Sequence, residues 1–366
     1  VTQFIDGSGP IFGGSVFPFV FITIACGAIS GFHALISSGT TPKLIDNERH
    51  IPMIGYGGML LEAFVAIMAM VAACVLEPGI YFAINSPAGI VGTEANEIIS
   101  KINSWGYSVT VEQMNQLAKD VGESTLFART GGAPSLAVGM ATIFANAFGK
   151  HLLALWYHFA IMFEAVFILT TLDSGTRVGR FMLQDMLGNL HPKLGQTSWL
   201  PSIILTSFIV VSCWGYFLYI GVIDPNGGVN ILWPLFGIAN QMLAAIALSV
   251  GTAILIKSDK IKFAWITAIP LVWLMIVTTS AAYQKIFSED IRIGFLSAAN
   301  SMSEKISNGY IPDYGIDVAQ KLIFNLKLDA GITIFLVIIL WIVIIDVIRI
   351  ALTTNIKNRK RKLSDV

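Results

Sequence analysis

The sequence has 366 residues, of which 55% are hydrophobic and only 13% are charged, with a mean hydropathy of +0.71. Soluble domains carry about 25% charged residues, so this composition excludes an ordinary soluble protein and indicates an integral membrane protein. The formal net charge is zero, and nothing in the charge balance points to a nucleic-acid partner.

The sequence contains three cysteines, Cys26, Cys74 and Cys213, each inside an apolar run. Their odd number and their spacing match neither a disulfide framework nor a metal site. We therefore interpret them as small packing residues and expect no bound metal. The sequence opens at Val1 without an initiator Met or a signal peptide, which leads us to expect that it belongs to a longer precursor.

Apolar runs long enough to cross a bilayer follow one another along the chain. A helix of about 20 residues spans the hydrocarbon core. The run 134–149 is too short for a full span, and we interpret it as re-entrant or as an extension of the next helix. The expected fold class is an all-α integral membrane protein, a helical bundle. The spans predicted are 16–37, 52–76, 151–173, 199–221, 229–256, 262–284 and 329–349.

Lysine and arginine near the ends of short loops predict the orientation of the bundle. The C-terminal tail 350–366 is strongly basic and is placed in the cytoplasm. The basic loops 257–262, 174–198 and 38–51 then fall on the same side. This arrangement leaves 77–133 outside as an extracytoplasmic loop.

The outer segment carries its own helical patterns, over 93–102 and over 110–119, the second beginning after Thr110 as N-cap. Long structured loops are often lids over a binding site, and the alternative is a surface segment without a functional role.

The end of the first run, Cys26–Lys43, is too polar and too rich in glycine for a segment that only spans. Glycine costs about 1 kcal/mol in a helix interior, and a buried imidazole needs partners. Irregular backbone survives in hydrocarbon only where protein buries it or where it lines a watery cavity, and transporters use such broken helices to hold substrates. We predict a break near Gly27–Gly31 whose half-helix N–H groups meet a substrate carboxylate. The alternative for the hydroxyls is tight helix packing.

The polar residues of run 229–256 have two interpretations. Asn240 and Gln241 can contact a substrate or bond a neighbouring helix, and the row Gly237, Gln241, Ala245 and Ser249 suits helix contact. We weigh the two equally for Asn240 and favour an interhelical bond for Gln241. The predicted substrate-binding residues are Gly27, Ser30, Gly31, His33, Ser37 and Asn240.

Two carboxylates lie within predicted spans, and intramembrane carboxylates commonly serve proton relays. Glu164 shares one helical face with Tyr157 and Thr171. Glu62 lies in the middle of 52–76 and can instead bond a neighbouring helix. We predict proton coupling through Glu164, with His33 or Glu62.

A cluster of hard oxygens at the end of run 151–173 offers a different coupling ion, because such ligands suit small cations. The residues of this alternative ion site are Thr170, Thr171, Asp173 and Ser174. Asp173 can equally cap a separate amphipathic helix over 176–190.

The sequence contains no Walker loop, dinucleotide fingerprint or HExxH motif, so we expect no cofactor. A gradient-driven carrier fits these features better than an ATP-driven pump. An intramembrane enzyme with His33 and Ser30 or Ser37 as base and nucleophile lacks a third orienting group, so we expect no enzymatic activity. A nutrient sensor without transport is a further alternative.

Four runs, 19–33, 37–43, 172–177 and 233–242, resemble the carbon starvation protein A family of bacterial inner-membrane carriers. The resemblance covers essentially the whole chain. It implies uptake of small nutrients, peptides in some members and pyruvate in others, when carbon runs short. The expected location is the bacterial inner membrane, with a cytoplasmic C-terminus.

The resemblance also implies a fold, because the family is grouped with the amino acid–polyamine–organocation carriers, which contain two inverted five-helix repeats. Run 16–37 would then be the broken sixth helix, and 77–133 would be the lid loop between the seventh and eighth helices. Sodium-coupled relatives bind the ion with hydroxyls near the inner end of the eighth helix, where Thr170, Thr171 and Ser174 occupy a comparable place. The implied partners are the substrate, H⁺ or Na⁺, the lipid bilayer and further N-terminal helices.

Overall fold

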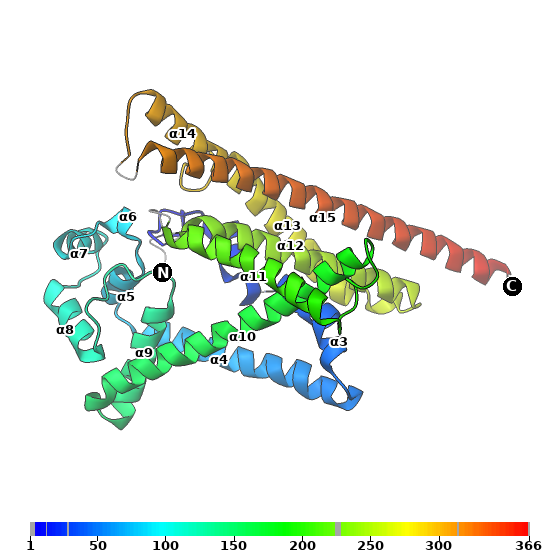
Figure 1. Ribbon diagram of the computed structural model, residues 1–366, viewed down its shortest axis with the longest axis horizontal. Coiled ribbons are helices and arrows are strands. Elements are labelled where there is room, and N and C mark those ends of the chain that lie inside the picture. The colour runs from blue at the N-terminus through cyan, green and yellow to red at the C-terminus, as the bar shows by residue number, and fades with distance from the viewer. Residues whose placement is uncertain (1–3, 12, 28, 224–227, 313–314, 365–366) are drawn as a thin grey trace. The chain divides into compact units, whose positions relative to one another are not determined.

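The computed structural model describes residues 4–11, 13–27, 29–223, 228–312 and 315–364 (Figure 1). Side chains are described for these residues except 25, 220–223, 228–234 and 354–364. The structure is 79% helix, and no described residue lies in a strand. This confirms the all-α fold class.

The chain divides into two compact units, each treated by itself below. Unit 1 comprises Val1–Leu35 and Asn230–Val366, and unit 2 comprises Ile36–Val229.

Unit 1 is a bundle of long helices that packs on a short interrupted segment. The segment consists of α1 (Val16–Ile24), the turn η1 (Ala25–Gly27) and α2 (Gly31–Leu35). The long helices are α12 (Gly228–Lys257), α13 (Trp265–Phe287) and α15 (Ile316–Ser364), and the shorter α14 (Phe295–Ser307) runs beside α15 (Figure 1). The core of this unit includes Phe19, Ile22, Ile238, Met242, Leu274 and Leu340.

Unit 2 is organised around α10 (Leu153–Gly188), a continuous helix of 36 residues. The helices α9 (Ala133–Phe148) and α11 (Leu200–Ile223) pack on α10, and α9 also packs on α4 (Gly58–Val75). The π-helical turn η2 (Ile36–Thr40) contacts α10 as well and leads into α3 (Thr41–Leu44). Chain reversal between α9 and α10 occurs at Gly149, whose φ of 118° favours glycine.

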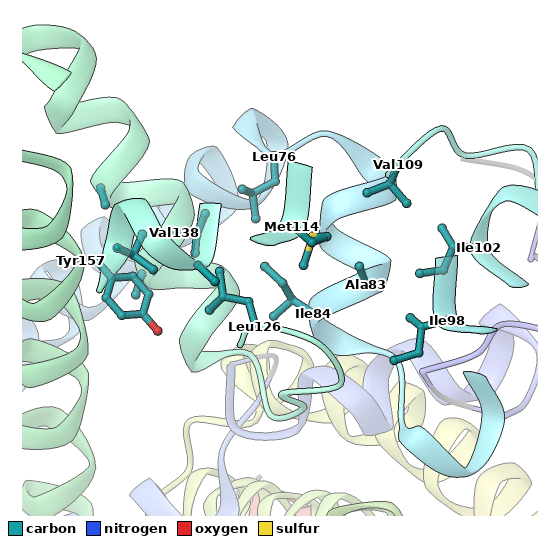
Figure 2. Packing of buried hydrophobic residues seen from close by; sticks show 14 of the residues in the cluster. Leu76, Ala83, Ile84, Ile98, Ile102, Val109, Met114, Leu126, Val138 and Tyr157 are labelled. Carbon is teal, nitrogen blue, oxygen red and sulfur yellow. The ribbon is translucent and has the colours of Figure 1, made fainter. Parts of the chain in front are cut away.

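The segment after α4 folds into a small helical subdomain with its own core. It contains α5 (Pro78–Asn85), α6 (Ala88–Val91), α7 (Ala95–Ser104) and α8 (Val111–Val121). Figure 2 shows Ile84, Met114 and Leu126 close together within the buried cluster, which also takes in Tyr157 of α10. The prediction of an N-cap at Thr110 is confirmed, because its side chain and that of Gln113 form a capping box.

The structure contains six helices that are long and apolar enough to cross a membrane, counted over the described residues. The predicted run 16–37 is not among them, because α1 ends at Ile24. The shorter apolar helix is α9. The six are Glu48–Val75, Lys150–Gly188, Leu200–Tyr219, Leu235–Lys257, Trp265–Phe287 and Ile316–Thr353.

The suggestion that Asp173 caps a separate helix over 176–190 is wrong. Asp173 lies inside α10, which continues without interruption to Gly188. Its carboxylate pairs instead with Arg177 one turn later, at 3.1 Å, which supports the helix at i,i+4 spacing. Val178 and Phe181 beyond it are buried, so burial continues along the helix past the presumed boundary.

Candidate functional site

The interruption between α1 and α2 in unit 1 exposes backbone groups that a continuous helix would satisfy. The last carbonyl groups of α1 and the first N–H groups of α2 have no partner within their own helix. Such groups must find partners elsewhere when protein or lipid surrounds them, because an unsatisfied buried polar group is costly.

Two adjacent side chains of α12 bind the two halves of the interrupted segment. Asn240 Oδ1 accepts a hydrogen bond of 2.8 Å from the backbone N–H of Phe32, in the first turn of α2. Gln241 Nε2 donates to the carbonyl of Phe21, in the last turn of α1. Asn240 is 3% exposed and Gln241 is 0% exposed. We refer to Asn240 and Gln241 as the amide clamp, and the interhelical bond favoured for Gln241 is confirmed.

Two glycines allow α12 to approach the segment closely enough for these bonds. A Cβ at Gly31 would lie 2.1 Å from the carbonyl oxygen of Asn240, and a Cβ at Gly237 would lie 2.3 Å from the carbonyl oxygen of Ile22. Both contacts are with backbone atoms, which cannot rotate away. The absence of a side chain at each position is therefore part of the clamp geometry.

Three further polar side chains gather at the interruption. Ser30 Oγ accepts a 3.0 Å hydrogen bond from the backbone N–H of His33 and lies 2.7 Å from His33 Nδ1. Cys26 Sγ lies 3.4 Å from the same ring nitrogen. The sequence interpretation of Cys26 as a packing residue missed this cluster. The i+4 and i+7 spacing of Cys26 to Ser30 and His33 is the signal that could have found it.

These hydrogen bonds change the expected role of the half-helix N-terminus. The sequence predicts that the first N–H groups of α2 meet a substrate carboxylate, whereas in the structure Phe32 N–H donates to Asn240 and His33 N–H donates to Ser30. The buried Nδ2 of Asn240, by contrast, has no hydrogen-bond partner among the described residues. A buried N–H donor without an acceptor costs free energy, unless a bound ligand supplies the acceptor.

The structure brings most of the predicted substrate-binding residues together in unit 1. Gly27, Ser30, Gly31 and His33 lie in or beside the interruption, and Asn240 contacts it from α12. Ser37 lies in η2 of unit 2, which packs against α10.

The carboxylates predicted to couple protons lie in unit 2. Glu164 is partly buried in the first half of α10, and its Oε2 is buried without a hydrogen-bond partner in the described part of the chain. Glu62 lies on the exposed surface of α4.

The residues of the alternative ion site lie close to one another along α10, but two of them already interact with other groups of the protein. Thr170 Oγ1 donates to the carbonyl of Phe167, and the carboxylate of Asp173 pairs with Arg177. Thr171 is exposed and Ser174 is partly buried. Across the described ranges, no three His, Cys, Asp or Glu side chains group in a way that could hold a metal ion.

The family model described as "Carbon starvation protein CstA" matches residues 1–281. The chain is 51% identical to "Peptide transporter CstA" of Escherichia coli (strain K12), over 96% of this chain and 51% of that protein. It is 49% identical to "Pyruvate/proton symporter BtsT" of the same organism, over 94% of this chain and 51% of that protein. No solved structure matches.

A third relative, "Peptide transporter CstA" of Campylobacter jejuni, is 51% identical over 84% of this chain and 45% of that protein. The chain thus spans about half the length of the curated relatives it matches. These relatives are named as transporters, and none of the three names describes an enzyme.

Proposed function

Because the chain belongs to the carbon starvation protein CstA family, we propose that it forms part of a secondary carrier for a small nutrient, a peptide or pyruvate. The carrier takes up its substrate across the bacterial inner membrane when carbon is scarce. Six helices long and apolar enough to span a membrane support a multi-pass carrier. The basic tail supports a cytoplasmic C-terminus, because Lys and Arg are enriched in cytoplasmic segments.

The proposed carrier follows the inverted-repeat plan, with α1 and α2 as the two halves of its sixth helix. The interruption between Ile24 and Gly31 supports this assignment, as does the folded subdomain that follows α4. Further helices of the carrier would complete the second half of the site, because this chain spans about half the length of the curated relatives.

The substrate carboxylate is bound at the interruption. The observation that carries this proposal is the buried Nδ2 of Asn240, which has no hydrogen-bond partner among the residues described. Its carboxamide oxygen is fixed by Phe32 N–H, so the amide nitrogen is held in one orientation. Peptides and pyruvate share a carboxylate, and this donor suits it. Ser30 and His33 contribute further polar contacts beside it.

The transported substrate moves with a proton carried by Glu164, with His33 or Glu62 as the second proton-binding group. The buried and unpartnered Oε2 of Glu164 supports this role, because a carboxyl group at such a position is stable when protonated. The sodium alternative at Thr170, Thr171, Asp173 and Ser174 is less favoured, since Asp173 already pairs with Arg177.

Counterflow in vesicles that contain the full-length carrier tests the proposal. Vesicles preloaded with unlabelled pyruvate or with a dipeptide are expected to exchange it for the labelled form, whereas a neutral sugar is not exchanged. Net accumulation is expected to follow an inward proton gradient and to ignore external sodium at fixed pH. Accumulation that requires sodium would contradict proton coupling, and saturable binding without exchange would favour the sensor.

A further inference from the structure

A polar pocket in unit 2 has no part in the proposed transport path. It has a volume of about 410 Å³ and lies where α10 and α11 pack together. All its lining side chains are polar or charged: Asp173, Thr176, Arg177, Arg180 and Ser207. The pocket is therefore unsuited to an apolar ligand.

The charges of the pocket favour an anion. Two guanidinium groups face one carboxylate, and that carboxylate already holds Arg177 through contacts of 3.2 Å from Nε and 3.1 Å from a terminal nitrogen. A guanidinium that is oriented in this way still has N–H groups left to donate. The pocket therefore keeps an excess positive charge, which also disfavours a cation at Asp173.

Arg180 supplies the second donor of the pocket. Its Nε is buried and has no hydrogen-bond partner in the part of the chain that the structure describes. Its guanidinium carbon lies over the Phe181 ring, 4.6 Å from the ring centre, and this cation–π contact helps to hold the group in place. An orientated guanidinium with an unused donor binds oxyanions, and phosphate oxygens in particular.

The position of the pocket along α10 corresponds to the headgroup layer of the membrane. Because about 20 helical residues cross the hydrocarbon core, a helix that enters the core at Leu153 leaves it near Asp173. The following two turns, which carry Arg177 and Arg180, then lie among the headgroups of the inner leaflet. Lys43 of α3 lies near the same turns, with Nζ 3.9 Å from Asp185 and 4.5 Å from the centre of the Phe181 ring.

We propose that this pocket binds the phosphate group of an anionic phospholipid of the inner leaflet. Arg177 and Arg180 donate to the phosphate oxygens, and the hydroxyl groups of Thr176 and Ser207 line the rest of the pocket. Basic pockets between transmembrane helices on the cytoplasmic side recognise lipid headgroups in this way. The inference uses the orientation given under the proposed function, but it does not depend on transport.

Native mass spectrometry of the full-length carrier in detergent tests the inference, with phosphatidylglycerol and phosphatidylcholine as the added lipids. We expect phosphatidylglycerol to bind more tightly than phosphatidylcholine, and Arg180→Gln to weaken its binding about tenfold. Lys193→Gln is the matched control, because it removes a positive charge from the same inner connection at an exposed residue outside the pocket. This control is expected to bind phosphatidylglycerol as the unchanged protein does.

Further variants and a competitor keep the test decisive. Arg180→Lys retains the positive charge but lacks the planar guanidinium group. It is expected to bind phosphatidylglycerol more weakly than the unchanged protein and more tightly than Arg180→Gln. Such a graded series distinguishes a loss of recognition from misfolding. Equal binding by Arg180→Gln and the unchanged protein would overturn the inference, as would equal losses in Arg180→Gln and Lys193→Gln. Displacement of the lipid by millimolar inorganic phosphate would identify a free anion as the ligand and overturn the lipid assignment.

Discussion

Replacing Gly31 by alanine is expected to abolish uptake by the full-length carrier. The new Cβ would lie 2.1 Å from the carbonyl oxygen of Asn240 and 2.7 Å from the backbone nitrogen of Ala244, so α2 and α12 must move apart. Overpacking of this kind costs about 1–3 kcal/mol, and the movement also breaks the bond from Phe32 N–H to Asn240. Gly237→Ala is expected to act in the same way at Ile22.

The matched control for these variants is Gly251→Ala, on α12, the helix that also carries Gly237. A Cβ there would meet only Thr267 Cγ2, at 3.8 Å, which is ordinary contact. Initial rates of labelled-substrate uptake, normalised to the amount of protein in the membrane, measure the effect. Uptake by Gly31→Ala at the rate of Gly251→Ala would show that the close approach of the two helices has no role in transport.

Replacing Glu164 by glutamine is expected to remove proton-driven accumulation while exchange at equal concentrations continues. Glutamine keeps the size of the side chain but cannot carry a proton, so a proton gradient no longer drives the substrate. A gradient of one pH unit supplies a factor of about ten in accumulation for each coupled proton, and this factor should be lost. Vesicles with an imposed pH gradient measure accumulation, and counterflow in the same vesicles measures exchange.

The control for Glu164→Gln is Glu289→Gln, because Glu289 is exposed in the connection after α13, outside the membrane-spanning helices. It is expected to leave both measurements unchanged. Full accumulation by Glu164→Gln would move the proton role to Glu62 or His33. Loss of exchange as well as accumulation would indicate that Glu164 serves substrate binding or folding.

The helix break was predictable because its cause is local. Glycines with a serine, a histidine and a following proline within one apolar run are unfavourable for a continuous membrane helix, whatever surrounds them. The helices at Ala95–Ser104 and Val111–Val121 could be predicted for the same reason, since amphipathic spacing and a capping residue lie within each segment. Such signals do not depend on the rest of the fold.

The amide clamp could not be derived in the same way, because its partners lie more than 200 residues apart in the sequence. The pattern around Asn240 left substrate contact and interhelical bonding equally weighted. The structure gives its Oδ1 an interhelical bond and leaves its Nδ2 without a partner among the described residues, so one side chain can serve both interpretations. The capping role suggested for Asp173 was wrong for a related reason. A capping signal is local, and it does not reveal that the helix continues and stays packed beyond Asp173.

The central claim is that Asn240 Nδ2 binds the substrate carboxylate, and Asn240→Asp tests it most directly. Aspartate keeps an oxygen to accept from Phe32 N–H and has nearly the same size, but it replaces the donor with an oxygen that repels a carboxylate. Affinity for the carboxylate substrate selected by counterflow is to be measured by equilibrium binding, with its neutral amide as reference.

We expect the affinity of Asn240→Asp for the carboxylate substrate to fall about 10- to 100-fold, the worth of a hydrogen bond to a charged group. The melting temperature is expected to fall, because a carboxyl group at this buried position costs free energy, whereas the affinity for the neutral amide should be nearly unchanged. An unaltered affinity of Asn240→Asp for the carboxylate substrate, in protein that is folded and active in exchange, would contradict the account.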